Sequence, residues 1–196
     1  MAVTMEQIKE LRDATGVSVM QCQKALTEAG GDINKAILLL RKISGDVAAK
    51  KSERTLGAGT VACYVHSNHG VGAMVILSCE TDFVSKNEDF QSIAYNIAMH
   101  VAATNPPYLK REDIPEDEMK LVMETLKEEV PKDKPEPIRE KILEGKVNDY
   151  LKTKVLLEQS FIKDETQTIS DLVKGAVQKF GERTEVAKFV RFSVAR

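Results

Sequence analysis

An apolar run at residues 71–78 constrains the fold of this chain more than any other segment. It has the length of a strand, and its apolar residues occupy both odd and even positions, which predicts a central strand buried on both faces. The segment 79–84 (CETDFV) follows, and then Ser85 to Glu88 has the Ser-x-x-Glu spacing of a capping box that starts a helix. The sequence therefore predicts a strand-to-helix corner that carries Asp82 and Phe83.

Phe83 at such a corner has two interpretations. Its ring either folds back onto the core, as most phenylalanines do, or is presented to a partner. The sequence pattern alone favours burial and leaves presentation open.

The first 43 residues predict a module of three short helices. Thr4 and Ser18 each begin a capping box, Gly30 and Gly31 end the second helix, and Asp32 starts the third. Residues 44–58 are then rich in Gly, Ala and charge, and we expect a linker there, with its Lys-Lys pair as solvated charge rather than a binding patch.

Residues 59–196 predict an α+β core. Strands are expected at 60–66, 71–79 and 185–194, and helices at 90–102, from Pro115, at 138–151 and at 169–180. Segment 155–162 either ends a helix or is extended. This order predicts an antiparallel three-stranded sheet packed with helices.

Composition excludes several classes of protein. The net charge is −2, with 30% charged residues of both signs interspersed, so the basic surface of a nucleic-acid-binding protein is not expected. No apolar run has the length of a membrane span, and the N-terminus lacks the apolar region of a signal peptide. Cys22, Cys63 and Cys79 lie in apolar patterns, which predicts buried thiols in a reducing compartment. We expect a soluble, cytoplasmic protein.

Motifs for catalysis, cofactors or metals are missing from the sequence. It contains no phosphate-binding loop, dinucleotide fingerprint or His-Glu-x-x-His motif. Cys63 and His66 are three residues apart on a strand and therefore point to opposite faces, while His69 lies in a turn, so no zinc site is expected. His100 is expected on the polar side of its helix or at its margin. An enzyme, a cofactor and a bound metal are not predicted.

Three segments resemble the elongation factor Ts family, in the expected order. Residues 80–87 (ETDFVSKN) are similar to the family signature, residues 11–26 to its opening helices, and residues 156–164 to the segment that closes its core helices. The resemblance covers essentially the whole chain. It implies a ubiquitin-associated-like N-terminal module and a guanine-nucleotide exchange factor for elongation factor Tu.

The resemblance also implies roles for individual residues. In the family, residues at the positions of Thr81, Asp82, Phe83 and Val84 enter the partner's GTPase domain near Mg²⁺, with Phe83 as an apolar wedge and Asp82 as the charge that disturbs the metal's ligands. A second contact is implied for the N-terminal module, at Leu11, Arg12, Val19 and Met20. Met20 can equally be read as core of the module.

The length of the chain implies an assembly. Longer family members have a duplicated core and an inserted coiled coil, whereas this chain has one core and no heptad repeat. By resemblance to short members we expect a non-covalent homodimer, pairing through the strand at 189–194. The alternative function is an adaptor that binds a partner through its three-helix module alone.

Overall fold

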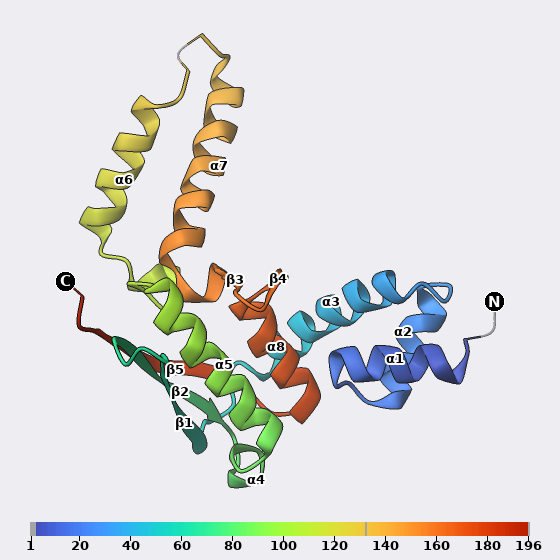
Figure 1. Ribbon diagram of the computed structural model, residues 1–196. Helices are drawn as coiled ribbons and strands as arrows, with labels where there is room; N and C mark the ends of the chain where they lie inside the picture. The colour runs from blue at the N-terminus through green and yellow to red at the C-terminus, as the bar shows by residue number, and fades with distance from the viewer. Residues whose placement is uncertain (1–2, 132, 196) are drawn as a thin grey trace.

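The computed structural model describes residues 3–131 and 133–195. Met1 and Ala2, at the start of the segment that lacks a signal-peptide pattern, lie outside the described residues, as do Lys132 and Arg196. The predicted fold class is confirmed: an N-terminal helical module precedes an antiparallel three-stranded sheet packed with helices (Figure 1). Among the described residues, no helix is long and apolar enough to cross a membrane.

The N-terminal module consists of α1 (Met5–Thr15), α2 (Val19–Glu28) and the first half of α3 (Ile33–Lys51). Its predicted N-caps are confirmed: the side chains of Thr4, Ser18 and Asp32 each accept a hydrogen bond from an amide in the first turn of their helix. The predicted capping box is complete at Thr4, whereas at Ser18 only the side-chain half of it forms. Gly30 and Gly31 have φ angles of 66° and 87°, which glycine adopts without strain, and they reverse the chain between α2 and α3. The helices enclose a small apolar core of their own.

Helix α3 is longer than the sequence predicted. The expectation of an irregular linker from residue 44 is wrong over its first eight residues, because α3 continues to Lys51. Ser44 is buried, and its hydroxyl has two acceptors within hydrogen-bond distance, the carbonyl oxygen of Leu40 and the side-chain oxygen of Gln178 on α8 (Ile169–Phe180). Packing against α8 offsets the cost of Gly45 in a helix, which is about 1 kcal/mol relative to alanine.

The sheet has the strand order β1 (Ala58–Val65), β2 (Val71–Cys79), β5 (Glu185–Ser193), and all pairs are antiparallel. The prediction that β2 is central is confirmed, but the prediction that both of its faces are buried is wrong, because Met74 and Ile76 are exposed. A tight turn joins β1 to β2, in which His69 has a φ angle of 56°. On β2, the side chains of Ala73, Val75 and Leu77 are buried on one face of the sheet.

Helix α5 (Glu88–Thr104) packs across that buried face and contacts all three strands. Its first turn is capped by Asn87, whose side-chain oxygen accepts from the Asp89 amide at 2.9 Å. The prediction that Ser85 caps this helix is therefore wrong, because Ser85 is the last residue of the preceding helix, α4 (Asp82–Ser85). Phe90 is fully buried and makes an edge-on contact with Phe180 of α8.

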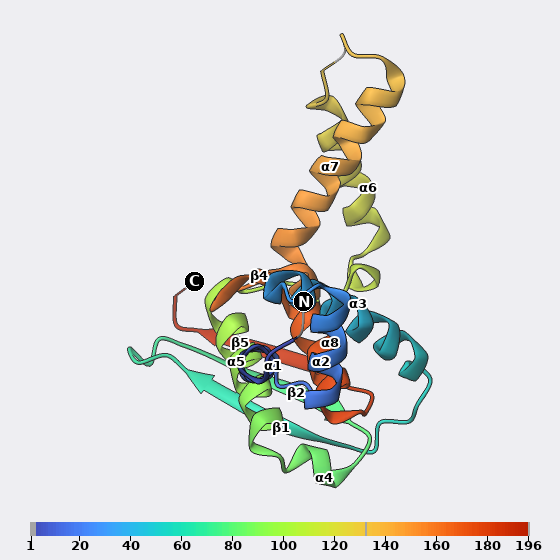
Figure 2. The ribbon, with the colours of Figure 1, turned by 90° about the vertical axis from the view of Figure 1, so that its right-hand side faces the viewer.

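Helices α6 (Glu116–Glu128) and α7 (Glu136–Lys154) form a hairpin that projects from the core (Figures 1 and 2). Both helices were predicted, but their pairing was not, because neither carries a heptad repeat. The hairpin is packed at its base, where Glu118 accepts hydrogen bonds from the hydroxyls of Tyr108 and Tyr150. Leu121 on α6 and Ile138 on α7 are exposed.

The segment left open by the sequence is neither a helix end nor one extended strand. It forms a 3₁₀ turn (Leu156–Glu158) and a small two-stranded ribbon of β3 (Ser160–Phe161) and β4 (Asp164–Thr168). A second 3₁₀ turn lies earlier in the chain, at Arg111–Asp113. Thr168 then caps α8 through a capping box with Asp171.

His100 is fully buried on α5, so its predicted place at the polar margin of the helix is wrong. Its Nε2 lies 2.9 Å from the side-chain oxygen of Gln159, and its Nδ1 accepts from the amide of Ile162 at 3.4 Å. Because an amide oxygen can only accept, Nε2 carries the proton and the ring is neutral. Burial lowers the pKa of His100, partly offset by the bond to Gln159.

We expect this histidine to make the protein less stable in mild acid. Its pKa in the folded chain is lower than the unfolded value of about 6.5, so the unfolded chain binds the proton first, and stability is lost as pH falls below that value. The free energy of unfolding, measured with urea between pH 7.5 and 5.5, should fall with a slope of up to about 1.4 kcal/mol per pH unit.

In His100→Gln this slope should flatten, although the variant starts from a lower stability. His69→Asn, at an exposed turn histidine, should keep the wild-type slope. An unchanged slope in His100→Gln would show that other groups cause the pH dependence.

Candidate functional site

The predicted corner (residues 81–84) joins the end of β2 to α4. Thr81 is the N-cap of α4, and its hydroxyl oxygen accepts from the Val84 amide at 3.5 Å. Val84 is buried in the main core, whereas Asp82 and Phe83 point outward, with 85% of Phe83 exposed. The favoured interpretation of a buried Phe83 is therefore wrong, and the ring is presented to solvent.

Charged groups at the base of the corner bind it to the turn that follows α8. The carboxylate of Glu182 accepts hydrogen bonds from the amides of Glu80 and Thr81, at 3.1 and 3.0 Å, and from the Thr81 hydroxyl at 2.6 Å. In the opposite direction, the carboxylate of Glu80 accepts from the Arg183 amide at 2.5 Å and from the Arg54 guanidinium at 3.3 Å. We call this set of bonds the clasp.

The clasp favours the charged form of the Glu80 carboxyl. The Arg183 amide, helped by the nearby Arg54 guanidinium, lowers the pKa of the Glu80 carboxyl. The sequence motif contains Glu80 but gave no sign of Glu182 or Arg183, which lie about a hundred residues further along the chain. No periodicity or short motif connects positions so far apart, so only the fold could bring them together.

Cys79 is an inert part of the same corner. Its thiol is buried, donates to the Thr81 carbonyl at 3.3 Å, and has a pKa raised first by burial and then by the charge of Glu182. A raised pKa disfavours the reactive thiolate. Cys22 is likewise buried, as predicted, but Cys63 is exposed on β1, so that prediction is wrong for one of the three cysteines.

The residues predicted on the N-terminal module divide into two groups. Arg12, Val19 and Met20 are exposed, with 77% of Met20 accessible, which excludes its alternative role as core of the module. Leu11 is fully buried in the core of the module, so its predicted contact with a partner is corrected to a supporting one. The Ser18 cap places Val19 and Met20 in the first turn of α2, where both side chains reach solvent.

The structure keeps these two predicted sets apart. Helix α4 lies at the end of the core opposite to the α6–α7 tip, and at a distance from α1 and α2 in both views (Figures 1 and 2). The corner and the module therefore offer two surfaces rather than one site.

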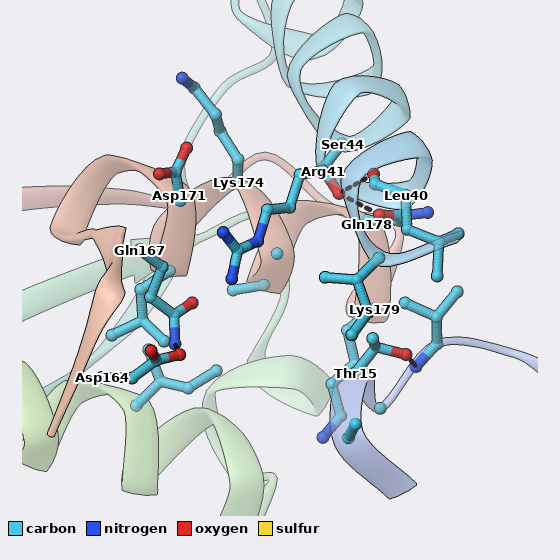
Figure 3. A pocket seen from close by; sticks show the side chains of 18 of the residues that line it. Thr15, Leu40, Arg41, Ser44, Asp164, Gln167, Asp171, Lys174, Gln178 and Lys179 are labelled. Carbon is cyan, nitrogen blue, oxygen red and sulfur yellow. Dashed lines mark hydrogen bonds between the residues drawn. The ribbon is translucent and has the colours of Figure 1, made fainter. Parts of the chain in front are cut away.

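A cleft of about 490 Å³ lies where the module meets the core, between α3 and α8 (Figure 3). Several of its charged groups already have partners within the chain: Arg41 donates to the Thr166 carbonyl at 2.7 Å, Lys179 to Asp89 at 2.8 Å, and Asp171 caps α8. This arrangement is that of a junction joining the module to the core.

The residues tested for a metal site do not converge. Cys63 is exposed on β1, while Nδ1 of His66 is 2.9 Å from the Tyr64 hydroxyl. Within residues 3–131 and 133–195, no three His, Cys, Asp or Glu side chains are grouped so that they could hold a metal ion.

Comparison with known proteins assigns the family. The family model described as elongation factor TS matches residues 2–196. Elongation factor Ts of Thermosipho melanesiensis is 47% identical over 98% of this chain and 98% of its own length. The corresponding proteins of Herpetosiphon aurantiacus and Thermotoga maritima are 46% and 41% identical, each over 99% of this chain and 98% and 97% of their own lengths. The chain therefore belongs to the elongation factor Ts family of translation elongation factors.

Proposed function

We propose that this chain promotes the release of GDP from elongation factor Tu by inserting its corner beside the bound Mg²⁺. The observation that carries the proposal is the exposure of Phe83 on a short helix that is anchored on both sides. Val84 anchors one side by packing into the core, and the clasp holds Thr81 on the other.

Phe83 supplies the binding energy at the corner. Its ring is 85% exposed in the free chain, so it gains little from folding. Burial of a phenylalanine side chain in a partner's apolar pocket contributes about 1.5–3 kcal/mol. This energy is available to open the partner next to its nucleotide.

Asp82 supplies negative charge at the same point. It is exposed, and its ion pair with Lys86 spans 3.6 Å between two side chains that are each more than three-quarters exposed, so the pair contributes little and separates easily. Mg²⁺ requires nearly ideal octahedral coordination, so a carboxylate that displaces one ligand or water weakens the site. Loss of Mg²⁺ then weakens the hold on the diphosphate.

This mechanism needs no covalent step by the chain. Binding of the factor and binding of nucleotide to elongation factor Tu are negatively coupled, and such coupling acts equally in both directions. The factor therefore displaces GDP, and a newly bound nucleotide displaces the factor.

The exposed surface of the N-terminal module supports a second contact with elongation factor Tu, through Arg12, Val19 and Met20. Met is well suited to an adaptable apolar contact. The adaptor alternative assigns all binding to this surface and leaves the presented Asp82 and Phe83 without a role, so we propose the exchange function instead.

The corner can be tested by the release of a fluorescent GDP analogue from elongation factor Tu. The wild-type chain should accelerate release. In Phe83→Ala the acceleration should fall by about 10-fold or more, because the loss of 1.5–3 kcal/mol corresponds to about 10–150-fold in rate. Asp82→Ala should also reduce it.

Leu121→Ala provides the matched control, since it removes a large exposed apolar side chain from α6. It should accelerate release as the wild-type chain does. Met20→Ala should weaken binding to elongation factor Tu and leave the maximal rate of release unchanged. A point variant is preferable to deletion of residues 1–43, which would cut α3 in its middle.

Full acceleration by both corner variants would place the exchange activity elsewhere in the chain. An inactive wild-type chain would leave the adaptor function.

The sheet supports a further part of the proposal, a homodimer. On the face turned away from α5, the strand register aligns three rows: Val61 with Ile76 and Lys188, Cys63 with Met74 and Val190, and Val65 with Gly72 and Phe192. We call these residues the outer sheet face. Its apolar side chains are exposed, and it contains a single charged residue, Lys188.

A second copy of the same chain is the occupant that fits this outer sheet face. A nearly uncharged apolar sheet packs well against another, at a spacing of about 10 Å, and a twofold axis makes one surface complementary to itself. This proposal keeps the predicted contribution of residues 189–194 but replaces pairing along the strand edge with stacking of faces.

Sedimentation velocity tests the dimer. The wild-type chain should sediment as a dimer at micromolar concentration, and Met74→Lys, which places a charge in the middle row, should sediment as a monomer. Leu121→Lys adds the same charge to an exposed site on α6 and should remain dimeric. A monomeric wild-type chain, or a Met74→Lys variant that remains dimeric, would rule out this interface.

A further inference from the structure

The presented corner has little structure of its own to hold it in place. Helix α4 is only four residues long, and a helix so short is not stable by itself. Asp82 and Phe83 are exposed, so they add little packing or ion-pair energy. The direction in which Phe83 leaves the core must therefore be set by the residues at the two ends of α4.

At the first end of α4, the Thr81 hydroxyl has two partners. It accepts from the Val84 amide and donates to Glu182 at 2.6 Å, so it links the first turn of α4 to the turn after α8. The other oxygen of the Glu182 carboxylate accepts from the Glu80 and Thr81 amides. One side chain thus holds the backbone and the cap of the corner together.

The turn that carries Glu182 is itself held by the end of α3 and the residues that follow it. Lys51 donates to the Gly181 carbonyl, and the Arg183 guanidinium donates to the Arg54 carbonyl. The backbone amide of Arg183 donates to Glu80, and the guanidinium of Arg183 pairs with the Glu185 carboxylate at 2.8 Å. The position of Glu182 is therefore fixed from both sides before any partner binds.

We propose that Glu182 is a positioning residue for nucleotide exchange: its carboxylate holds Thr81, and thereby aims Asp82 and Phe83 at the partner. This inference rests on the proposed exchange function. Without the carboxylate, binding must order the corner at the same time as it displaces Mg²⁺. Ordering even one residue costs enough to lower a rate by about tenfold.

The variant Glu182→Gln tests this role, because it keeps the size of the side chain but removes the charge and one acceptor oxygen. In the assay of fluorescent GDP release, the maximal rate at saturating factor should fall about tenfold. The factor concentration that gives half of the maximal rate should change less than threefold, because the exposed module surface is intact. A loss of folded protein would instead raise that concentration and leave the maximal rate unchanged.

Glu53→Gln is the matched control. Glu53 is exposed and precedes Arg54, and the substitution removes the same charge from outside the clasp. It should behave as wild type in the assay. If Glu53→Gln slows release as much as Glu182→Gln does, the effect is one of overall charge and the positioning role is wrong.

A double-mutant cycle with Phe83→Ala shows whether Glu182 acts through the corner. If it does, Glu182→Gln should have a smaller effect in the Phe83→Ala background than in the wild-type chain, because only Asp82 is then left to be positioned. Independent, multiplying losses would overturn the proposal.

The outcomes separate this inference from the proposed function. An inactive wild-type chain contradicts the exchange function itself. An active wild-type chain with an equally active Glu182→Gln variant contradicts only the positioning role. If thermal unfolding followed by circular dichroism shows that Glu182→Gln is unfolded, Thr81→Val tests the same link from the other side: the proposal expects the same tenfold loss in maximal rate, and full activity would contradict it.

Discussion

The hydrogen bonds between Glu182 and the backbone at residues 80 and 81 are the interaction on which the functional end of this structure depends. They join two segments about a hundred residues apart, the end of the central strand and the turn after α8. In the opposite direction, the carboxylate of Glu80 accepts from the Arg183 amide, so each of the two carboxylates accepts from backbone amides of the other segment. Carboxylate bonds to amides are charge-assisted and stronger than neutral ones. These bonds fix the start of α4, a four-residue helix that is not stable by itself. That helix presents Phe83 to solvent.

The two faces of the sheet have different surroundings and different roles. One face is buried under α5 and forms the main core with α8, which gives the corner a rigid base. The opposite face exposes rows of apolar side chains, which we assign to a second copy of the chain. The N-terminal module is joined to this core by α3, whose second half packs on α8 and whose end reaches the clasp through Lys51. Contacts of α3 therefore connect the N-terminal module both to the core and to the turn that carries Glu182.

Sequence analysis predicted the features that depend on local signals. The apolar run of β2, the caps at Thr4 and Ser18 and the proline before α6 each determine their own segment. The strand, both caps and the helix were confirmed, although one face of β2 is exposed. The course of α3 beyond Ser44 was missed because packing on α8 outweighs the effect of Gly45. The family resemblance identified the corner residues, and exposure in the structure distinguished Phe83 and Met20 from the buried Leu11. The exposure of Cys63 and the burial of His100 were predicted wrongly, because the periodicity of a strand or helix does not say which of its faces is covered. Glu182 was missed, because no local pattern reveals a partner so distant in the sequence.

The central claim is that the corner is ordered before a partner binds, and amide hydrogen exchange followed by NMR on the free chain tests it most directly. The account predicts that the amides of Glu80 and Thr81 exchange much more slowly than those of an unstructured chain. It also predicts that Glu182→Ala, which removes both acceptor oxygens, abolishes this protection while the amide of Ile97, in the middle of α5, remains protected. Exchange at Glu80 and Thr81 as fast as in an unstructured peptide, in the wild-type chain, would contradict the account.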